Sequence, residues 1–124
     1  INDTYGHLAA NFVLRKLADV IRGCIRKIDI PSRFGGEEFL ICLPETRLEQ
    51  ALSVADKLHD QIDHLIIHDD LSKADMHITI SCGVANLPKN SDWGVEELIK
   101  TADEALFHAK TNGRNQVYGK SVVA

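Results

Sequence analysis

The order of helix-like and strand-like segments constrains the fold of this chain more than any other feature of the sequence. Apolar residues recur at helical spacing from Val13 to Ile28, which predicts a long amphipathic helix over about residues 8–27. Similar patterns predict helices at 47–65 and 95–110, strands at 32–34, 38–43, 76–87 and 116–118, and a loop at 66–75. Helices that alternate with hairpin-connected strands predict a two-layer α+β sandwich, with the helices packed on a mostly antiparallel sheet.

Two helix boundaries are predicted from individual residues. Thr46, followed three residues later by Glu49, fits a capping box at the start of the second helix. Asn112 and Gly113 fit a glycine C-cap at the end of the third helix.

The composition is that of an ordinary globular domain. With 124 residues, 44% of them hydrophobic and 26% charged, the chain is long enough for one domain with a core but too short for two. The net charge of -4 argues against general binding to nucleic acid, because proteins that follow the phosphate backbone usually carry a basic excess. The three cysteines are expected to be free thiols in the reducing cytoplasm. No apolar run reaches the ~20 residues that a membrane-spanning helix needs.

The sequence "RFGGEEF", residues 33–39, places two glycines and two acids between the first two predicted strands. Gly35 and Gly36 suit a hairpin turn, because glycine adopts positive φ without steric cost. That role leaves Glu37 and Glu38 unexplained, since acidic residues are disfavoured in strands. Mg²⁺ is commonly held by one or two carboxylates together with substrate phosphates, so the turn is a candidate metal and nucleotide site. A solvated acidic turn is the alternative.

Cations and amides elsewhere in the chain are candidates for the same site. Lys110 and Arg114 lie near the end of the third predicted helix, where both could bind one anion. The alternative is that Lys110 only complements the helix dipole. Asn2, His7 and Asn11 precede or open the first predicted helix, where they could contact a base edge or an anion. N-capping of that helix is their alternative role.

Arg26 and Asp29 form a third candidate pair, three residues apart and just ahead of the double glycine. An arginine can bind guanine or phosphate through two parallel hydrogen bonds, and an aspartate can accept hydrogen bonds from a guanine edge. The alternative is an ordinary surface ion pair worth less than about 1 kcal/mol.

Five motifs, in this order and at these separations, resemble the GGDEF domain family of diguanylate cyclases in its GGEEF form: "NDTYGH", "RFGGEEF", "ITISCGVA", "ADEALFHAK" and "NGRN". The resemblance covers nearly the whole chain and implies one GGDEF domain over residues 1–124. It also implies an architecture like that of nucleotidyl cyclases and polymerase palm domains.

The resemblance implies that two GTP molecules are condensed into cyclic di-GMP, a bacterial second messenger, with release of pyrophosphate. Each domain holds one GTP, so a homodimer is expected to be the active form, with Mg²⁺ or Mn²⁺ as the cofactor. By position, Glu37 resembles the metal ligand that accepts the proton of the 3′-hydroxyl, and Glu38 its neighbour in the metal site. Arg26 and Asp29 match the "RxxD" product-inhibition site. The residues that match substrate-binding positions are Asn2, His7, Asn11, Gly35, Gly36, Lys110 and Arg114.

Two departures from the family pattern bear on activity. Family members carry a first, central strand with a metal-binding aspartate, followed by a lysine, just before the "NDTYGH" segment, and this chain begins after that point. The domain is therefore expected to be partial at its N-terminus, to lack the first strand and to show little or no turnover by itself. Asn11 stands where the family has aspartate, and Ala10 where it has glycine. An amide offers one acceptor oxygen, so guanine selectivity is expected to be weaker.

Two functions follow from the resemblance. The first is a cytoplasmic cyclase domain, controlled by an upstream sensor or receiver domain in a longer protein whose missing N-terminal region is a candidate membrane anchor. The alternative is a catalytically impaired GGDEF domain that binds cyclic di-GMP or GTP without making product.

Overall fold

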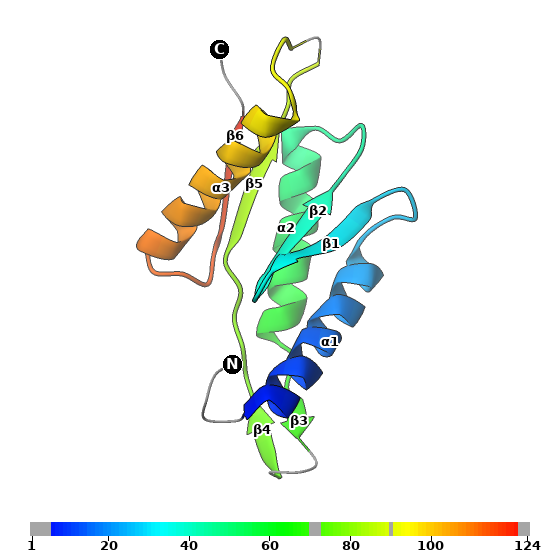
Figure 1. Ribbon diagram of the computed structural model, residues 1–124, viewed down its shortest axis with the longest axis vertical. Helices are drawn as coiled ribbons and strands as arrows, with labels where there is room; N and C mark the ends of the chain where they lie inside the picture. Colours follow the sequence, from blue (N-terminus) through cyan, green and yellow to red (C-terminus); the bar gives the residue numbers. More distant parts are fainter. Residues whose placement is uncertain (1–5, 70–72, 90, 122–124) are drawn as a thin grey trace.

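The computed structural model describes residues 6–69, 73–89 and 91–121 (Figure 1). The chain forms three helices and six strands in these ranges, which confirms the predicted α+β class. In chain order the elements are α1 (Gly6–Cys24), β1 (Ile30–Gly35), β2 (Glu38–Cys42), α2 (Leu48–Asp63), β3 (Ile67–Asp69), β4 (Ala74–Met76), β5 (Cys82–Asn86), α3 (Val95–Thr111) and β6 (Val117–Ser121).

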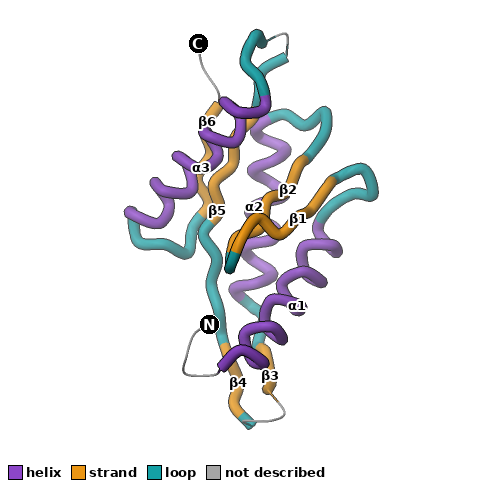
Figure 2. The backbone as a smooth tube through the Cα atoms, in the orientation of Figure 1, coloured by secondary structure: helices purple, strands orange, loops and turns teal. Residues whose placement is uncertain are grey.

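The strands form three separate two-stranded ladders within the described ranges (Figure 2). The β1–β2 and β3–β4 pairs are antiparallel, and the β5–β6 pair is parallel. Strand pairing is therefore mostly antiparallel, as predicted, but the ladders of the described residues do not join into one sheet, since no hydrogen bonds pair β2 with β5. The β1–β2 hairpin accordingly has no hydrogen-bonded neighbour on either outer edge among the described residues.

The hydrophobic core lies mainly between α1 and α2. Val13 and Ile62 are each 1% exposed, and Ile67 of β3 is 2% exposed beside them. Phe39 and Ile41 of β2 pack against this core from the hairpin. The helical spacing of apolar residues in α1 thus reports a buried face, as expected for an amphipathic helix.

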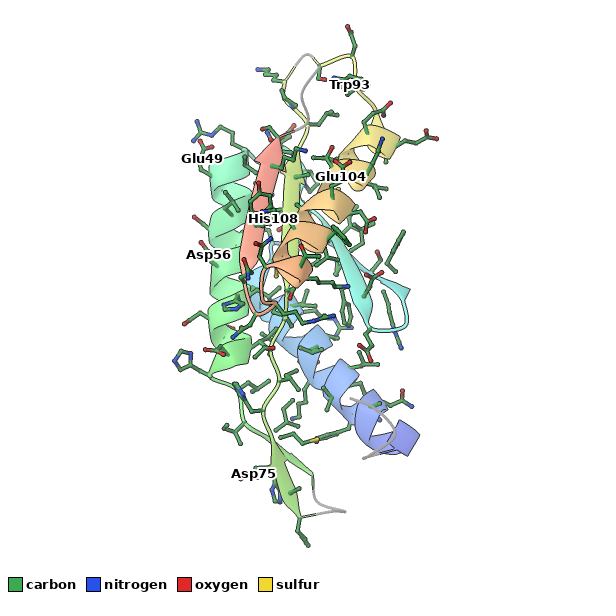
Figure 3. The ribbon with its side chains drawn as sticks, turned by 90° about the vertical axis from the view of Figure 1, so that its left-hand side faces the viewer. Glu49, Asp56, Asp75, Trp93, Glu104 and His108 are labelled. Atoms are coloured by element: carbon green, nitrogen blue, oxygen red, sulfur yellow. The ribbon has the colours of Figure 1, made fainter. Side chains whose placement is uncertain are left out.

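The β5–β6 ladder is packed between two helices, with α2 on one side and α3 on the other (Figure 3). Two glycines allow this packing. A Cβ at Gly83 of β5 would lie 2.2 Å from the backbone nitrogen of Leu106 in α3. A Cβ at Gly119 of β6 would lie 2.6 Å from Cδ2 of Leu52 in α2.

The end of α3 confirms the predicted glycine cap. Asn112 is the C-cap residue, and its N–H donates to the carbonyl of His108 at 3.1 Å. Gly113 follows with φ +109°, a conformation that costs glycine little. The first helix also forms as predicted, but it ends at Cys24, three residues before the predicted boundary.

The predicted capping box of α2 is wrong. The N-cap residue is Arg47, whose backbone N–H donates to Oε1 of Gln50 at 3.1 Å. The Thr46 hydroxyl instead donates to the carbonyl of Pro44 at 2.9 Å and accepts a hydrogen bond from Arg26 at 2.8 Å. A hydroxyl that bonds the preceding turn does not cap the following helix.

Two strand predictions are also wrong in part. Residues 67–69 and 74–75, predicted as loop, pair with each other and with Met76 as the β3–β4 hairpin, and Ile67 and Met76 are buried there. Residues 77–80, predicted as strand, form no ladder. Ile78 and Ile80 pack against the core, so the alternating pattern reports a buried face. A ladder also needs a neighbouring strand, and the described residues provide none for this segment.

Candidate active site

A groove of about 440 Å³ runs between α1 and the β1–β2 hairpin. Its apolar lining comes from both elements, including Leu14 of α1 and Phe39 of β2. Three of its lining residues are arginines and none is acidic, so the charged part of the lining is cationic. The polar residues that line it are Asn11, Arg15, Arg22, Ser32 and Arg33.

The double glycine forms the tip of the hairpin. Gly35 ends β1, and Gly36, with φ +37°, begins the turn to Glu38. No atom lies within 4 Å of a Cβ built on either glycine, so the space beside the backbone is open. Glu37 is exposed in the turn, and its carboxylate makes no hydrogen bond or ion pair with the described part of the chain.

The end of α3 reaches the hairpin through an ion pair. Lys110 Nζ lies 3.5 Å from Oε2 of Glu38, with 38% of the lysine side chain and 47% of the glutamate side chain exposed. A pair this exposed contributes at most about 1 kcal/mol to stability. Its importance is geometric, because it brings the predicted phosphate-binding lysine to the predicted metal-binding carboxylates.

Arg114 lies just beyond the C-cap of α3. Its backbone adopts φ +61°, and its N–H donates to the carbonyl of Ala109 at 2.9 Å. The side chain is exposed, in the loop that follows the helix carrying Lys110. The cap therefore fixes the backbone from which both predicted phosphate-binding cations extend.

Of the three predicted base-contacting residues, only Asn11 has a side chain within the described part of the structure. Asn11 is exposed on α1 and lines the groove. His7 belongs to the first turn of α1, but its side chain is outside the described part of the structure. Asn2 lies outside the described residues altogether.

Arg26 and Asp29 form a tight structural unit. Arg26 Nη2 donates to Oδ1 of Asp29 at 2.8 Å, and the Arg26 backbone N–H donates to Oδ2 at 2.7 Å. The aspartate side chain is only 1% exposed, whereas 53% of the arginine side chain is exposed. Hydrogen bonding from Arg26 lowers the pKa of Asp29, and the same bonds raise the pKa of Arg26.

The Arg26 guanidinium also joins the loop after α1 to the turn after β2 through hydrogen bonds. Besides Asp29, it donates to the carbonyl of Pro44 at 3.0 Å and to Oγ1 of Thr46 at 2.8 Å. The loop that leaves α1 is thereby tied to the turn between β2 and α2. The sequence predicted the pair but not these two partners, because nothing in the local pattern indicates that residues 18 and 20 positions away meet it.

The donor set is compatible with a hard divalent cation. Glu37 and Glu38 supply two adjacent carboxylates, and no group of three or more metal-binding side chains gathers elsewhere in the described residues. Two carboxylates suit Mg²⁺ only if phosphates and water complete its octahedral shell. The residues present therefore fit a metal that arrives with a nucleotide.

Fold and site together define an α+β domain with an acidic hairpin tip, a neighbouring lysine and a groove lined by arginines. A family model described as "Diguanylate cyclase, GGDEF domain" matches residues 1–116. The chain belongs to the GGDEF family.

Similar proteins and solved structures agree with this assignment. The chain is 38% identical over 117 residues to diguanylate cyclase A of Treponema denticola, covering 94% of this chain and 31% of the relative. It is 38% identical over 121 residues to the response regulator PleD of Caulobacter vibrioides, covering 98% of this chain and 26% of the relative. The chain thus spans less than a third of the length of these relatives.

Two solved domains have the same fold. The active GGEEF domain of a diguanylate cyclase from Vibrio cholerae superposes with a TM-score of 0.85 and 31% identity, covering 96% of this chain and 73% of that one. The GGDEF domain of DgcB from Caulobacter crescentus, solved in complex with c-di-GMP, gives a TM-score of 0.87 and 26% identity, covering 95% and 68%. In the described residues, no helix is long and apolar enough to cross a membrane.

Proposed function

We propose that this chain is the GTP-binding and catalytic part of a diguanylate cyclase that condenses two GTP molecules into cyclic di-GMP and pyrophosphate. The observation that carries the proposal is the contact between Lys110 and Glu38. This contact supports the proposal because it joins a lysine to the acidic hairpin tip, next to Phe39 of the groove lining, in a chain of the GGDEF family.

Each group has a role that its position supports. The groove between α1 and the hairpin would hold the guanine base, with Asn11 as a polar contact. Lys110 and Arg114 would bind the triphosphate, and Glu37 and Glu38 would hold the Mg²⁺ or Mn²⁺ that neutralises developing charge when it is bound. The open space beside Gly35 and Gly36 admits a nucleotide close to the backbone.

The chemistry requires two half-sites. The 3′-oxygen of one GTP forms a bond to the α-phosphorus of the other, the bond from that phosphorus to the β-phosphate oxygen breaks, and pyrophosphate leaves. Glu37 would accept the proton of the attacking hydroxyl, because its exposed carboxylate is free of other partners in the described part of the chain. Since each domain holds one GTP, we propose a homodimer in which two hairpin tips face each other.

We further propose that Arg26 and Asp29 bind cyclic di-GMP and inhibit the enzyme. Asp29 fixes the arginine in one orientation while half of its side chain remains exposed. A guanidinium held in this way is prepared to bind a guanine edge or a phosphate. The same observation favours the second candidate function, a GGDEF domain that senses cyclic di-GMP without making it.

Binding can be tested on the 124-residue chain. Titration with a non-hydrolysable GTP analogue and Mg²⁺ is expected to show binding that Lys110→Met weakens about tenfold or more, because a charge-assisted contact to phosphate is lost. Lys100→Met is the matched control, since Lys100 is an exposed lysine on the same helix. Equal weakening by both substitutions would argue against the proposed phosphate site.

Catalysis is tested with a longer protein that contains this segment, because the relatives are longer and turnover by the 124-residue chain alone is expected to be low. Formation of cyclic di-GMP from GTP, lost in Glu37→Gln and kept in Glu49→Gln, would support the cyclase. Glu49 is the control because it lies in the first turn of α2 and outside the proposed site. Binding of cyclic di-GMP without turnover, lost in Arg26→Ala, would support the sensor.

A further inference from the structure

The side chain of Arg33 folds back onto the hairpin tip. Its Nε and Nη2 both donate to the carbonyl oxygen of Gly36, at 2.9 and 2.7 Å. The strand register shifts between Arg33 and Gly35, so that Phe34 has no cross-strand partner. The bulge and the glycine turn interrupt the backbone hydrogen bonds between the two strands at the tip. The two bonds from Arg33 restrain the tip in their place.

The carbonyl that Arg33 holds belongs to the peptide group joining Gly36 to Glu37. Because a peptide group is planar, fixing its oxygen also fixes the direction of the Glu37 backbone nitrogen. The Glu37 carboxylate makes no hydrogen bond or ion pair with the described residues, so among them the backbone of the turn sets where it lies. We propose that Arg33 is the positioning residue for Glu37, a role that rests on the function proposed above.

Arginine suits this task better than lysine. Its planar guanidinium presents donors in a fixed fork, and two of them here converge on one oxygen. That arrangement sets both the distance and the angle of the carbonyl, whereas a lysine ammonium on a flexible chain would set only the distance. The contact therefore restrains the orientation of the turn.

The test measures the order of the hairpin tip and its metal affinity separately. ¹⁵N relaxation gives order parameters for the Gly36 and Glu37 amides, and electron paramagnetic resonance of free Mn²⁺ gives the affinity with a non-hydrolysable GTP analogue present. In Arg33→Met the order parameters are expected to fall from about 0.85 to below about 0.6. The Mn²⁺ affinity is expected to fall about three- to tenfold, and Arg33→Lys should be intermediate.

Two controls separate positioning from a general weakening of the hairpin. Ser32→Ala removes a hydrogen bond to the carbonyl of Leu40, 3.1 Å away across the same hairpin, and should leave the order of the tip near its original value. Arg47→Met removes an exposed arginine at the start of α2 and should change neither measurement. Loss of order spread equally along both strands in Ser32→Ala and Arg33→Met would overturn the proposal.

Two further results would also overturn it. One is a tip that stays ordered in Arg33→Met. The other is an Arg33→Met protein whose tip is less ordered but whose Mn²⁺ affinity is unchanged, provided that Glu37→Gln abolishes Mn²⁺ binding. If the unaltered chain and Glu37→Gln bind Mn²⁺ equally, the proposed metal site is wrong, and the order parameters alone then decide whether Arg33 fixes Glu37.

Discussion

Gly83 is the position at which one added carbon is expected to cost the most stability. A Cβ there would lie 2.2 Å from the backbone nitrogen of Leu106, 2.3 Å from the carbonyl oxygen of Ala102 and 2.7 Å from Cα of Leu106. All three atoms belong to the backbone of α3, so no side-chain rotation can relieve the clash. Either β5 or the whole helix must move.

The expected cost follows from what overpacking usually costs. Extra carbons in packed interiors destabilise proteins by about 1–3 kcal/mol, and a clash with helix backbone belongs at or above the upper limit, so we expect about 3 kcal/mol for Gly83→Ala. For a chain of this size that corresponds to a fall in melting temperature of about 10–15 °C. Urea and thermal unfolding followed by circular dichroism measure both quantities.

Two other glycines provide matched controls. A Cβ at Gly119 would meet side-chain atoms of Leu52, which can rotate, so Gly119→Ala should cost about 1 kcal/mol. Gly23 has no atom within 4 Å of the added carbon and lies in α1, so Gly23→Ala should gain about 0.5–1 kcal/mol. A Gly83→Ala protein that unfolds within about 0.5 kcal/mol of the original would refute the argument.

Three other substitutions or treatments test the described contacts. Asp29→Asn should lower the free energy of unfolding at pH 7 by about 1–3 kcal/mol, because a hydrogen-bonded ionic partner of Arg26 is lost. Because the pKa of Asp29 is lowered in the folded state, its carboxylate stabilises the fold above the unfolded pKa of 3.8, and this contribution is lost as the pH falls through the folded pKa. The free energy of unfolding of Asp29→Asn should therefore depend less on pH between about 5 and 2 than that of the unaltered chain. Iodoacetamide at pH 8 should modify the exposed Cys42 and spare Cys82, because burial raises the pKa of the Cys82 thiol to about 11. Mass spectrometry of the peptides identifies the modified thiol, and faster reaction at Cys82 would contradict its burial. Asn11→Asp should raise the preference for GTP over ATP in competition binding, since a carboxylate accepts both N–H groups of guanine.

The helices were predictable from the sequence because burial repeats along them with the helical period, whereas the first hairpin, whose β1 strand is exposed throughout, was predictable from its glycine turn. The apolar residues of α1 and the double glycine of the first hairpin are local signals of this kind. Residues 77–80 show the limit of such signals. Their alternation reflects the partial burial of Ile78 and Ile80 against the core, but a strand also depends on a neighbour that the local sequence does not contain.

The candidate site was predictable in its residue types and only partly in its contacts. Glu38 and Lys110 were each singled out from the sequence, and the structure adds that they lie 3.5 Å apart. The contact of Arg33 with the Gly36 carbonyl was not predicted, since an arginine just before a turn has many possible partners. The bonds of Arg26 to Pro44 and Thr46 depend on tertiary packing and have no local signal.

The hairpin that carries the acidic residues depends on side chains for its position. With no hydrogen-bonded strand on either outer edge in the described part of the chain, the β1–β2 ladder is held by the packing of Phe39 and Ile41 and by the Lys110–Glu38 pair. Of these contacts, only the ion pair joins the hairpin directly to the end of α3 that carries Lys110. Because that pair is half exposed and weak, a cation that competes for Glu38 would release Lys110 for a phosphate at little cost. Metal and nucleotide should therefore each strengthen binding of the other, and nucleotide affinity measured with and without Mg²⁺ in Glu38→Gln tests this coupling.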